Sequence, residues 1–267
     1  RHLRMTRQGL DRSLEHLASG SRINRAGEDA AGLAISENLR AQIRGLQQAE
    51  RNAQDGVSLV QVAEGGLQEI SNIMIRLREL AVQAASDTVG QTERKFLNSE
   101  YDALLSEIDR IANATEYNKI PLLNGTGTTF EIQVGTKNNP NIDRISFFDT
   151  SSADVNTVAL GINLTNVADK ASAQNALGAI DSSIVSVSSI RADFGAMQNR
   201  LQSIINNLAI SVENMSAANS RIRDTDVAYE TSELTKQNIL MQAGTSVLAQ
   251  ANQTISNAVT LLKSTGG

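Results

Sequence analysis

An apolar side chain recurs at every seventh position through residues 173–222 without a miss. Such spacing is typical of an α-helix that packs lengthwise on other helices, because the repeated side chains line one side of it. A second apolar row, interrupted by two polar residues, runs beside the first. The first row comprises Ile180, Val187, Phe194, Leu201, Leu208, Met215 and Ile222, and the second Leu177, Ile184, Ile205 and Val212. We therefore predict a long helix that begins near Ala171.

The N-terminal half carries the same kind of pattern from about Asp29 to Ala85, in steps of three, four or seven residues. At about 1.5 Å per residue, this helix would be roughly 85 Å long. Both prolines, Pro121 and Pro140, lie in the middle of the chain, which leaves both arms free of the strongest helix breaker. A third helix is predicted after a turn at Asp87–Gln91. Its apolar face comprises Leu97, Tyr101, Leu104, Ile108 and Ile111.

The middle of the chain changes to alternating apolar and polar residues. Phe130, Ile132 and Val134 alternate with polar neighbours, a turn sequence NNPN follows at 138–141, and alternation resumes at 145–147. This pattern predicts a β-hairpin. A further, weaker strand is predicted at Val155–Ile162.

Composition excludes several classes of function. The chain has no Cys, and its two histidines, His2 and His16, stand alone, so we expect no enzyme, no cofactor and no metal site. The charges sum to 24 − 29 = −5 and neither sign forms a run of five, which disfavours nucleic-acid binding. No apolar run is long enough to insert in a membrane.

Few aromatic residues but 40% hydrophobic residues suit thin seams of Leu, Ile, Val and Ala between helices. The predicted fold is therefore mainly α: a long antiparallel helical bundle or coiled coil, with a small β-hairpin region and paired terminal helices.

Both ends of the chain are amphipathic, and each apolar stripe needs a partner. We predict that the two stripes pair in an assembly of identical subunits whose contacts propagate into a helical filament. Packing within one chain is the alternative. The N-terminal stripe comprises Leu3, Leu10, Leu14 and Leu17, and the C-terminal stripe Leu248, Ala251, Ile255, Val259 and Leu262.

Three segments resemble bacterial flagellin in the order and spacing of that family. They are SGSRINRAGEDAAGLAISENLRAQIRGLQQAERNAQDGVSLVQVAEGGLQEI at 19–70, RLRELAVQAASDT at 76–88, and NSRIRDTDVAYETSELTKQNIL with QAGTSVLAQANQ at 219–253. The resemblance covers about 1–126 and 165–263. Flagellins usually begin about a dozen residues before Arg1, so we expect residues to precede it. The sequence Thr254-Ile255-Ser256 stands where relatives often carry a proline, which favours an unbroken helix here.

The resemblance implies a minimal flagellin with two domains. Residues 1–30 and 224–267 would form the inner-core coiled-coil domain, and residues 31–223 the outer-core helical domain, including the hairpin region at about 127–162. Its function would be that of a structural subunit of the extracellular flagellar filament, a hollow propeller for motility. The alternatives are a hook–filament junction protein and an exported coiled-coil effector. Asp29 is a predicted N-cap, and the loop Ser21–Asp29 would connect the terminal helix to the long one.

The resemblance also implies partners. The chain would bind copies of itself, a flagellar export chaperone, the filament cap and hook-junction proteins. In flagellins with the 76–88 motif, the matching positions are read by the animal Toll-like receptor for flagellin and are masked in the filament. Those positions here are Arg76, Leu80, Gln83 and Glu100, with the first three predicted to share one helix face.

Overall fold

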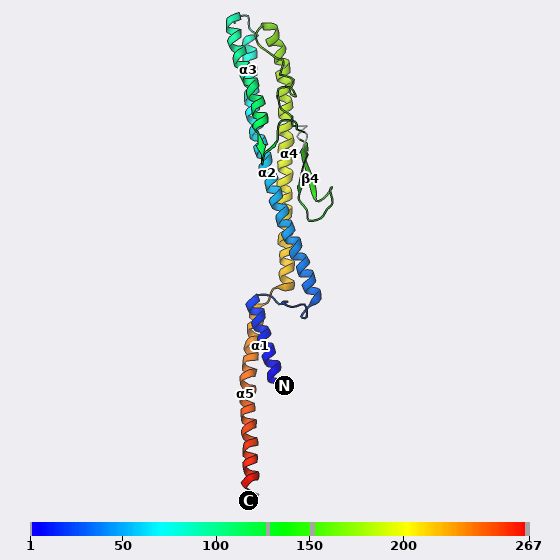
Figure 1. Ribbon diagram of the computed structural model, residues 1–267, viewed down its shortest axis with the longest axis vertical. Helices are drawn as coiled ribbons and strands as arrows, with labels where there is room; N and C mark the ends of the chain where they lie inside the picture. Colours follow the sequence, from blue (N-terminus) through cyan, green and yellow to red (C-terminus); the bar gives the residue numbers. More distant parts are fainter. Residues whose placement is uncertain (1, 127–128, 150–152, 265–267) are drawn as a thin grey trace. The chain divides into compact units, whose positions relative to one another are not determined.

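The computed structural model describes residues 2–126, 129–149 and 153–264, and the chain divides into two compact units (Figure 1). The larger unit is Arg44–Val212, and the smaller unit combines Arg1–Ile43 with Glu213–Gly267. The described residues form five helices and two two-stranded antiparallel sheets, so the mainly α prediction is confirmed. None of the helices in these described ranges is long and apolar enough to cross a bilayer.

Three long helices build the larger unit: α2 (Ala30–Ala84), α3 (Gln91–Ala114) and α4 (Lys170–Arg223). Their predicted positions are confirmed, with α2 ending one residue inside its predicted range. Helices α2 and α4 are antiparallel, because Arg78 pairs with Asp181 at 2.7 Å while Arg191 pairs with Glu64 at 3.9 Å. The predicted cap of α2 is also present, since Asp29 Oδ1 accepts the Gly32 amide at 2.8 Å.

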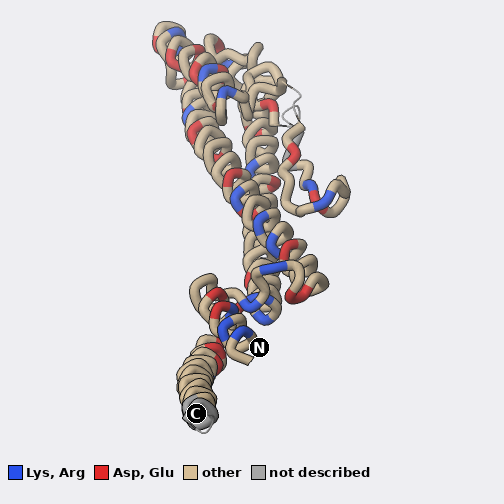
Figure 2. Tube along the Cα trace, turned by 60° about the horizontal axis from the view of Figure 1, so that its bottom comes forward, with Lys and Arg blue, Asp and Glu red and all other residues tan. Residues whose placement is uncertain are grey.

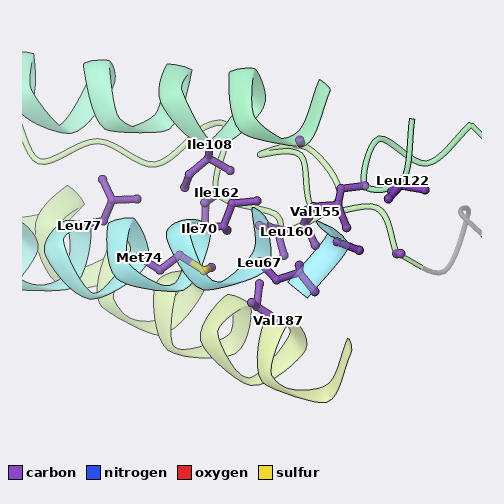
Figure 3. Close-up of a cluster of buried hydrophobic side chains, with 14 of the residues drawn as sticks. Leu67, Ile70, Met74, Leu77, Ile108, Leu122, Val155, Leu160, Ile162 and Val187 are labelled. Atoms are coloured by element: carbon purple, nitrogen blue, oxygen red, sulfur yellow. The ribbon is translucent and has the colours of Figure 1, made fainter. Parts of the chain in front are cut away.

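The core of the larger unit is a continuous apolar seam that follows the heptad repeat of α4. The repeat positions from Ile180 to Leu208 are at most 6% exposed, whereas Met215 and Ile222, in the smaller unit, are half-buried. Figure 3 shows Leu67, Ile70, Met74 and Leu77 of α2 gathered with Ile108 of α3 and Val187 of α4. The helices thus bury narrow apolar stripes against one another, as the spacing predicts.

One prediction is wrong for the segment that precedes α4. Val155–Ile162 forms turns rather than a strand. Asp109 of α3 accepts hydrogen bonds from the Thr157 amide at 2.7 Å and hydroxyl at 2.9 Å, and the Leu160 amide bonds back to Asn156. These local bonds replace strand pairing. The apolar residues that suggested a strand, Val155, Leu160 and Ile162, cap the helical core instead (Figure 3).

The predicted hairpin is formed by β3 (Thr129–Gln133) and β4 (Arg144–Asp149), which pair antiparallel. It lies on α2, where the side-chain Nδ2 of Asn52 donates to Gln133 O at 3.0 Å. Gly56 permits the close approach, because a Cβ there would overlap Ile132 Cδ1. Residues 127–128 and 150–152 of the predicted hairpin region lie outside the described residues.

A second, smaller hairpin was not predicted. Strands β1 (Glu116–Tyr117) and β2 (Ile120–Pro121) are joined by Asn118 and Lys119, which have φ angles of 50° and 66°. Two consecutive positive φ angles are the geometry of a type I′ turn, which Asn favours at its first position but Lys does not signal.

The smaller unit contains α1 (His2–Ser19) and α5 (Val227–Ser264), which run side by side in opposite directions (Figure 1). Helix α1 ends at Gly20, where φ is 67°. Helix α5 continues without interruption through Thr254–Ser256, as predicted from the absence of a proline.

Candidate assembly interface

The register of α1 on α5 decides which terminal residues meet within one chain. Gly244 lies against Leu3, since a Cβ at Gly244 would be 3.2 Å from Leu3 Cδ2, and Gly9 lies against the Gln237 side chain. Near the other end of α1, His16 faces Glu230. Within the chain, α1 therefore covers α5 only from its first turn to about Val247.

The face of α1 that packs on α5 differs in part from the predicted stripe. Leu3, Leu10 and Leu17 are half-buried, but Leu14 is 47% exposed. The buried positions of α1 are instead two polar residues, Ser13 and His16. The predicted stripe comprised Leu3, Leu10, Leu14 and Leu17, whereas the most buried side chains of α1 within this chain are Ser13 and His16.

The described side chains of the C-terminal stripe are exposed. Every residue from 245 to 259 is exposed, including Ala251, and Leu248, Ile255 and Val259 are 50, 63 and 48% exposed. The side chain of Leu262 falls outside the described part of the chain. Residues 237–262 contain no Lys, Arg, Asp or Glu, so this part of α5 is uniformly tan in Figure 2. We name the apolar side of residues 245–259, which carries Leu248, Ala251, Ile255 and Val259, the free face of α5.

A groove adjoins the start of this free face. It has a volume of about 550 Å³, and Leu3 and Leu248 line the same groove. Its other apolar lining comes from Leu240, Ala243, Gly244 and Val247. The structure thus brings one member of each predicted stripe together within the chain, while the remaining pairings are not made there.

The two connections that join the terminal helices to α2 and α4 bind one another. The Arg22 amide donates to Arg223 O at 2.6 Å, and the Thr225 amide donates to Gly20 O at 3.1 Å. The Arg223 guanidinium pairs with Glu37, and its hydrogen bond is the main reason that the pKa of the Glu37 carboxyl lies below its ordinary value. The predicted connector loop is therefore held at its start by a backbone hydrogen bond to the end of α4, and the Arg223–Glu37 pair joins α4 to α2 beside it.

Three charged or ionisable residues that the sequence did not associate meet in the same unit. His16 lies between Glu28 of the connector loop and Glu230 in the first turn of α5, 3.5 and 3.4 Å away. The pKa of Glu28 lies below its ordinary value, chiefly because the Asn24 amide donates a hydrogen bond to this carboxyl. More than two hundred residues separate His16 from Glu230, so no local pattern could have revealed this cluster.

The predicted receptor or assembly surface is only partly at the surface. Arg76 and Glu100 form an ion pair at 2.8 Å, with side chains 48 and 44% exposed, and Gln83 is exposed. Leu80 is 0% exposed and belongs to the core. Residues four positions apart on a helix point in similar but not identical directions. Here Leu80 points into the core while Arg76 stays at the surface.

In the ranges 2–126, 129–149 and 153–264, no three His, Asp or Glu side chains are arranged to hold a metal ion. What the smaller unit offers is an apolar, uncharged helix face next to a groove, which is a surface for another helix rather than for a small substrate.

Comparison with known proteins agrees with this arrangement. Residues 1–128 match the bacterial flagellin N-terminal helical region, and residues 177–262 match the bacterial flagellin C-terminal helical region. A flagellin of Halalkalibacterium halodurans is 46% identical over 252 residues, covering 94% of this chain and 91% of its own length.

Two solved structures share the fold. The crystal structure of Bacillus cereus flagellin is 35% identical, covers 63% of this chain and 94% of its own, and superposes with a TM-score of 0.53. A putative flagellar hook-associated protein from Vibrio parahaemolyticus covers 74% of this chain and 100% of its own with a TM-score of 0.61, but at 14% identity it shows the fold alone. On sequence and structure together, the chain belongs to the bacterial flagellin family.

Proposed function

We propose that the free face of α5 is the surface through which each copy of this chain binds its neighbours in the filament. As a flagellin, the chain is a structural subunit of the extracellular flagellar filament and serves motility. The proposal concerns which residues build that filament. It extends the predicted inner-core role of Leu248, Ala251, Ile255, Val259 and Leu262.

One observation carries the proposal: the exposed apolar side chains of the free face belong to a helix segment without charge. Burying Leu, Ile and Val surface contributes about 25 cal/mol per Å², and no charge has to be desolvated when this face is covered. Copies of the chain would supply the cover for this exposed apolar surface.

Substitutions on the free face test this proposal. Leu248→Asp and Ile255→Asp place charge on exposed positions, so the chain should keep its helical content but stop elongating filament seeds. Gln253→Asp, on the opposite side of the same segment, is the matched control and should elongate normally. Elongation is followed by negative-stain imaging after seeding. Normal elongation by Leu248→Asp and Ile255→Asp would refute the assembly role.

We also propose the domain assignment suggested by the resemblance. Residues 1–30 with 224–267 would act as the inner core, and residues 31–223 as the outer core. The compact units divide at other positions, near residues 43 and 213, because the ends of α2 and α4 pack beside the connectors. The hook–filament junction role is the nearest rival. It is disfavoured because sequence identity is high to a flagellin, although the fold is shared with the hook-associated protein.

Further partners remain part of the proposal. By family, these are the export chaperone, the filament cap, hook-junction proteins and the Toll-like receptor for flagellin. Exposure favours Arg76, Gln83 and Glu100 as the receptor surface, with Leu80 acting only as support beneath it. Monomer carrying Arg76→Ala should lose receptor signalling, and unchanged signalling would remove this partner. A family of structural proteins, and a surface without catalytic groups, give no support to an enzyme.

A further inference from the structure

Two glycines, one on each terminal helix, lie opposite larger side chains of the other helix. Gly9 of α1 faces Gln237 of α5, because a Cβ at Gly9 would lie 3.1 Å from Gln237 Cδ. Gly244 of α5 faces Leu3 of α1, because a Cβ there would lie 3.2 Å from Leu3 Cδ2. Both distances are tighter than ordinary van der Waals contact. Each glycine therefore forms a notch that the opposite side chain occupies, and we call these two contacts the glycine notches.

The side chain in the first notch is held by its own helix. Gln237 Nε2 donates a hydrogen bond to Glu233 Oε1 at 2.8 Å, one turn earlier in α5. This hydrogen bond is the main reason that the pKa of the Glu233 carboxyl lies below its ordinary value. Moving the Gln237 amide away from Gly9 would disturb this hydrogen bond, so the notch receives a side chain of fixed position.

The notches belong to one line of contacts along the antiparallel pair. On α5, the residues of this line follow one another at steps of seven, and the facing residues of α1 follow at steps of seven and six. Such spacing keeps one face of α5 against α1, as in a coiled coil. The three facing pairs are Glu230 with His16, Gln237 with Gly9, and Gly244 with Leu3.

Charge cannot specify the register of this stretch. Residues 237–262 of α5 contain no Lys, Arg, Asp or Glu, so α5 offers α1 no ion pair where the notches lie. In coiled coils, charges beside the seam often select one register. Without them, heptad spacing alone permits a shift by seven residues, which moves one helix along the other by about 10 Å.

The notches distinguish the observed register from both shifted ones. A shift by seven residues in one direction places Leu3 on Gln237, where no notch receives it. The opposite shift brings Gly9 opposite Gly244 and leaves a gap between the helices. Overfilled contacts and gaps both destabilise a packed interface. In the observed register alone, each glycine meets a large side chain.

We propose that Gly9 and Gly244 are positioning residues for filament assembly, which select one register of α1 on α5. A helical filament repeats identical contacts between identical subunits, so copies in different registers would present different surfaces to one another. The filament role follows from the family. The notches explain how every copy arrives at the same terminal helix pair, whichever face of α5 its neighbours cover.

Filling a notch and then reopening it from the other helix tests the proposal. Gly244→Leu fills the notch, and Leu3→Ala, added to it, returns the space. The chain has no Cys, so Thr6→Cys with Leu240→Cys, two positions that line the same groove, reports the register through a short thiol crosslinker. We expect Gly244→Leu to slow this crosslinking by at least about tenfold, and the added Leu3→Ala to restore it to within about threefold.

The second notch and a control complete the design. Gly9→Leu, alone and with Gln237→Ala, repeats the test at the other notch. Ser246→Leu changes an exposed position of α5 close to Gly244 and should crosslink as the unsubstituted chain does. Elongation on filament seeds should fall in each single notch variant and recover in each double variant. A general loss of helix stability would give no such recovery.

The proposal is overturned if both single notch variants crosslink and elongate as the unsubstituted chain does, or if the double variants stay as impaired as the single ones. Where a single variant does not fold, the return of the fold in its double variant supports the notch, and continued unfolding overturns it. Leu248→Asp and Ile255→Asp leave both notches intact. Failure of the free-face test therefore leaves the crosslinking result standing.

Discussion

At the scale of single residues, two adjacent glycines of α2 lie in opposite surroundings. A Cβ at Gly65 would meet nothing within 4 Å. A Cβ at Gly66 would lie 2.6 Å from Thr115 Oγ1 and 2.9 Å from Leu123 Cδ1. Nothing in the sequence distinguishes the two glycines, yet only Gly66 permits a close approach of the β1–β2 region to the helix.

Alanine substitution should separate these neighbours. Gly65→Ala should stabilise the chain by about 0.5–1 kcal/mol, since Ala loses less backbone entropy than Gly in a helix. Gly66→Ala should destabilise it by about 1 kcal/mol or more, because Thr115 and Leu123 must move. Thermal unfolding of the two variants measures both changes. Equal effects of the same sign would contradict the packing described for Gly66.

Tyr101 gives a prediction that depends on pH. Its hydroxyl lies 2.7 Å from Thr165 Oγ1, which itself donates to Ile162 O, so Tyr101 is the donor of the pair. Burial is the main reason that the pKa of Tyr101 is raised above its ordinary value of 10.0. Because the folded state holds this proton more tightly, the stabilisation is complete below about pH 10 and is lost as pH rises through the folded-state pKa.

Tyr101→Phe should therefore destabilise the chain by about 1 kcal/mol at neutral pH. The difference in unfolding free energy between the two chains should shrink above about pH 10. Only the unsubstituted chain carries the Tyr101 hydroxyl, whose contribution to stability is lost at high pH. Urea unfolding across this range measures it. A difference that is constant or grows with pH would argue against a buried, protonated Tyr101.

At the scale of elements, helices were predictable and short irregular segments were not. Heptad spacing and the positions of Pro121 and Pro140 gave α2, α3 and α4 within a residue or so, because each helix is specified by its own apolar stripe. The strand prediction for residues 155–162 was wrong because the apolar residues of this segment pack on helices. Its backbone hydrogen bonds also depend on Asp109, which is remote in sequence.

The contact between Ile132 of β3 and Gly56 of α2 gives a test at this scale. A leucine at position 56 would displace Ile132 from α2, so Gly56→Leu should speed amide exchange in Thr129–Gln133 by at least about tenfold. Ser58→Leu, at an exposed position of the same helix, is the control. Unchanged amide exchange in β3 would show that the hairpin does not depend on this contact.

At the scale of the whole molecule, the family and the paired terminal helices were predictable from the sequence. It did not give the register of α1 on α5, because apolar stripes on both helices permit several offsets. In that register Leu248, Ile255 and Val259 are exposed, and Ser13 and His16 are the buried residues of α1. The assembly residues are therefore proposed on the free face of α5 and not in two matched stripes.

The central claim is that neighbouring copies cover the free face in the filament. Hydrogen exchange of residues 245–259, compared between monomer and assembled filament, tests it most directly. We expect these amides to exchange within seconds to minutes in the monomer and to become protected by at least about a hundredfold in the filament. Equal exchange in monomer and filament would contradict the claim, because it would show that nothing covers this face when the chain assembles.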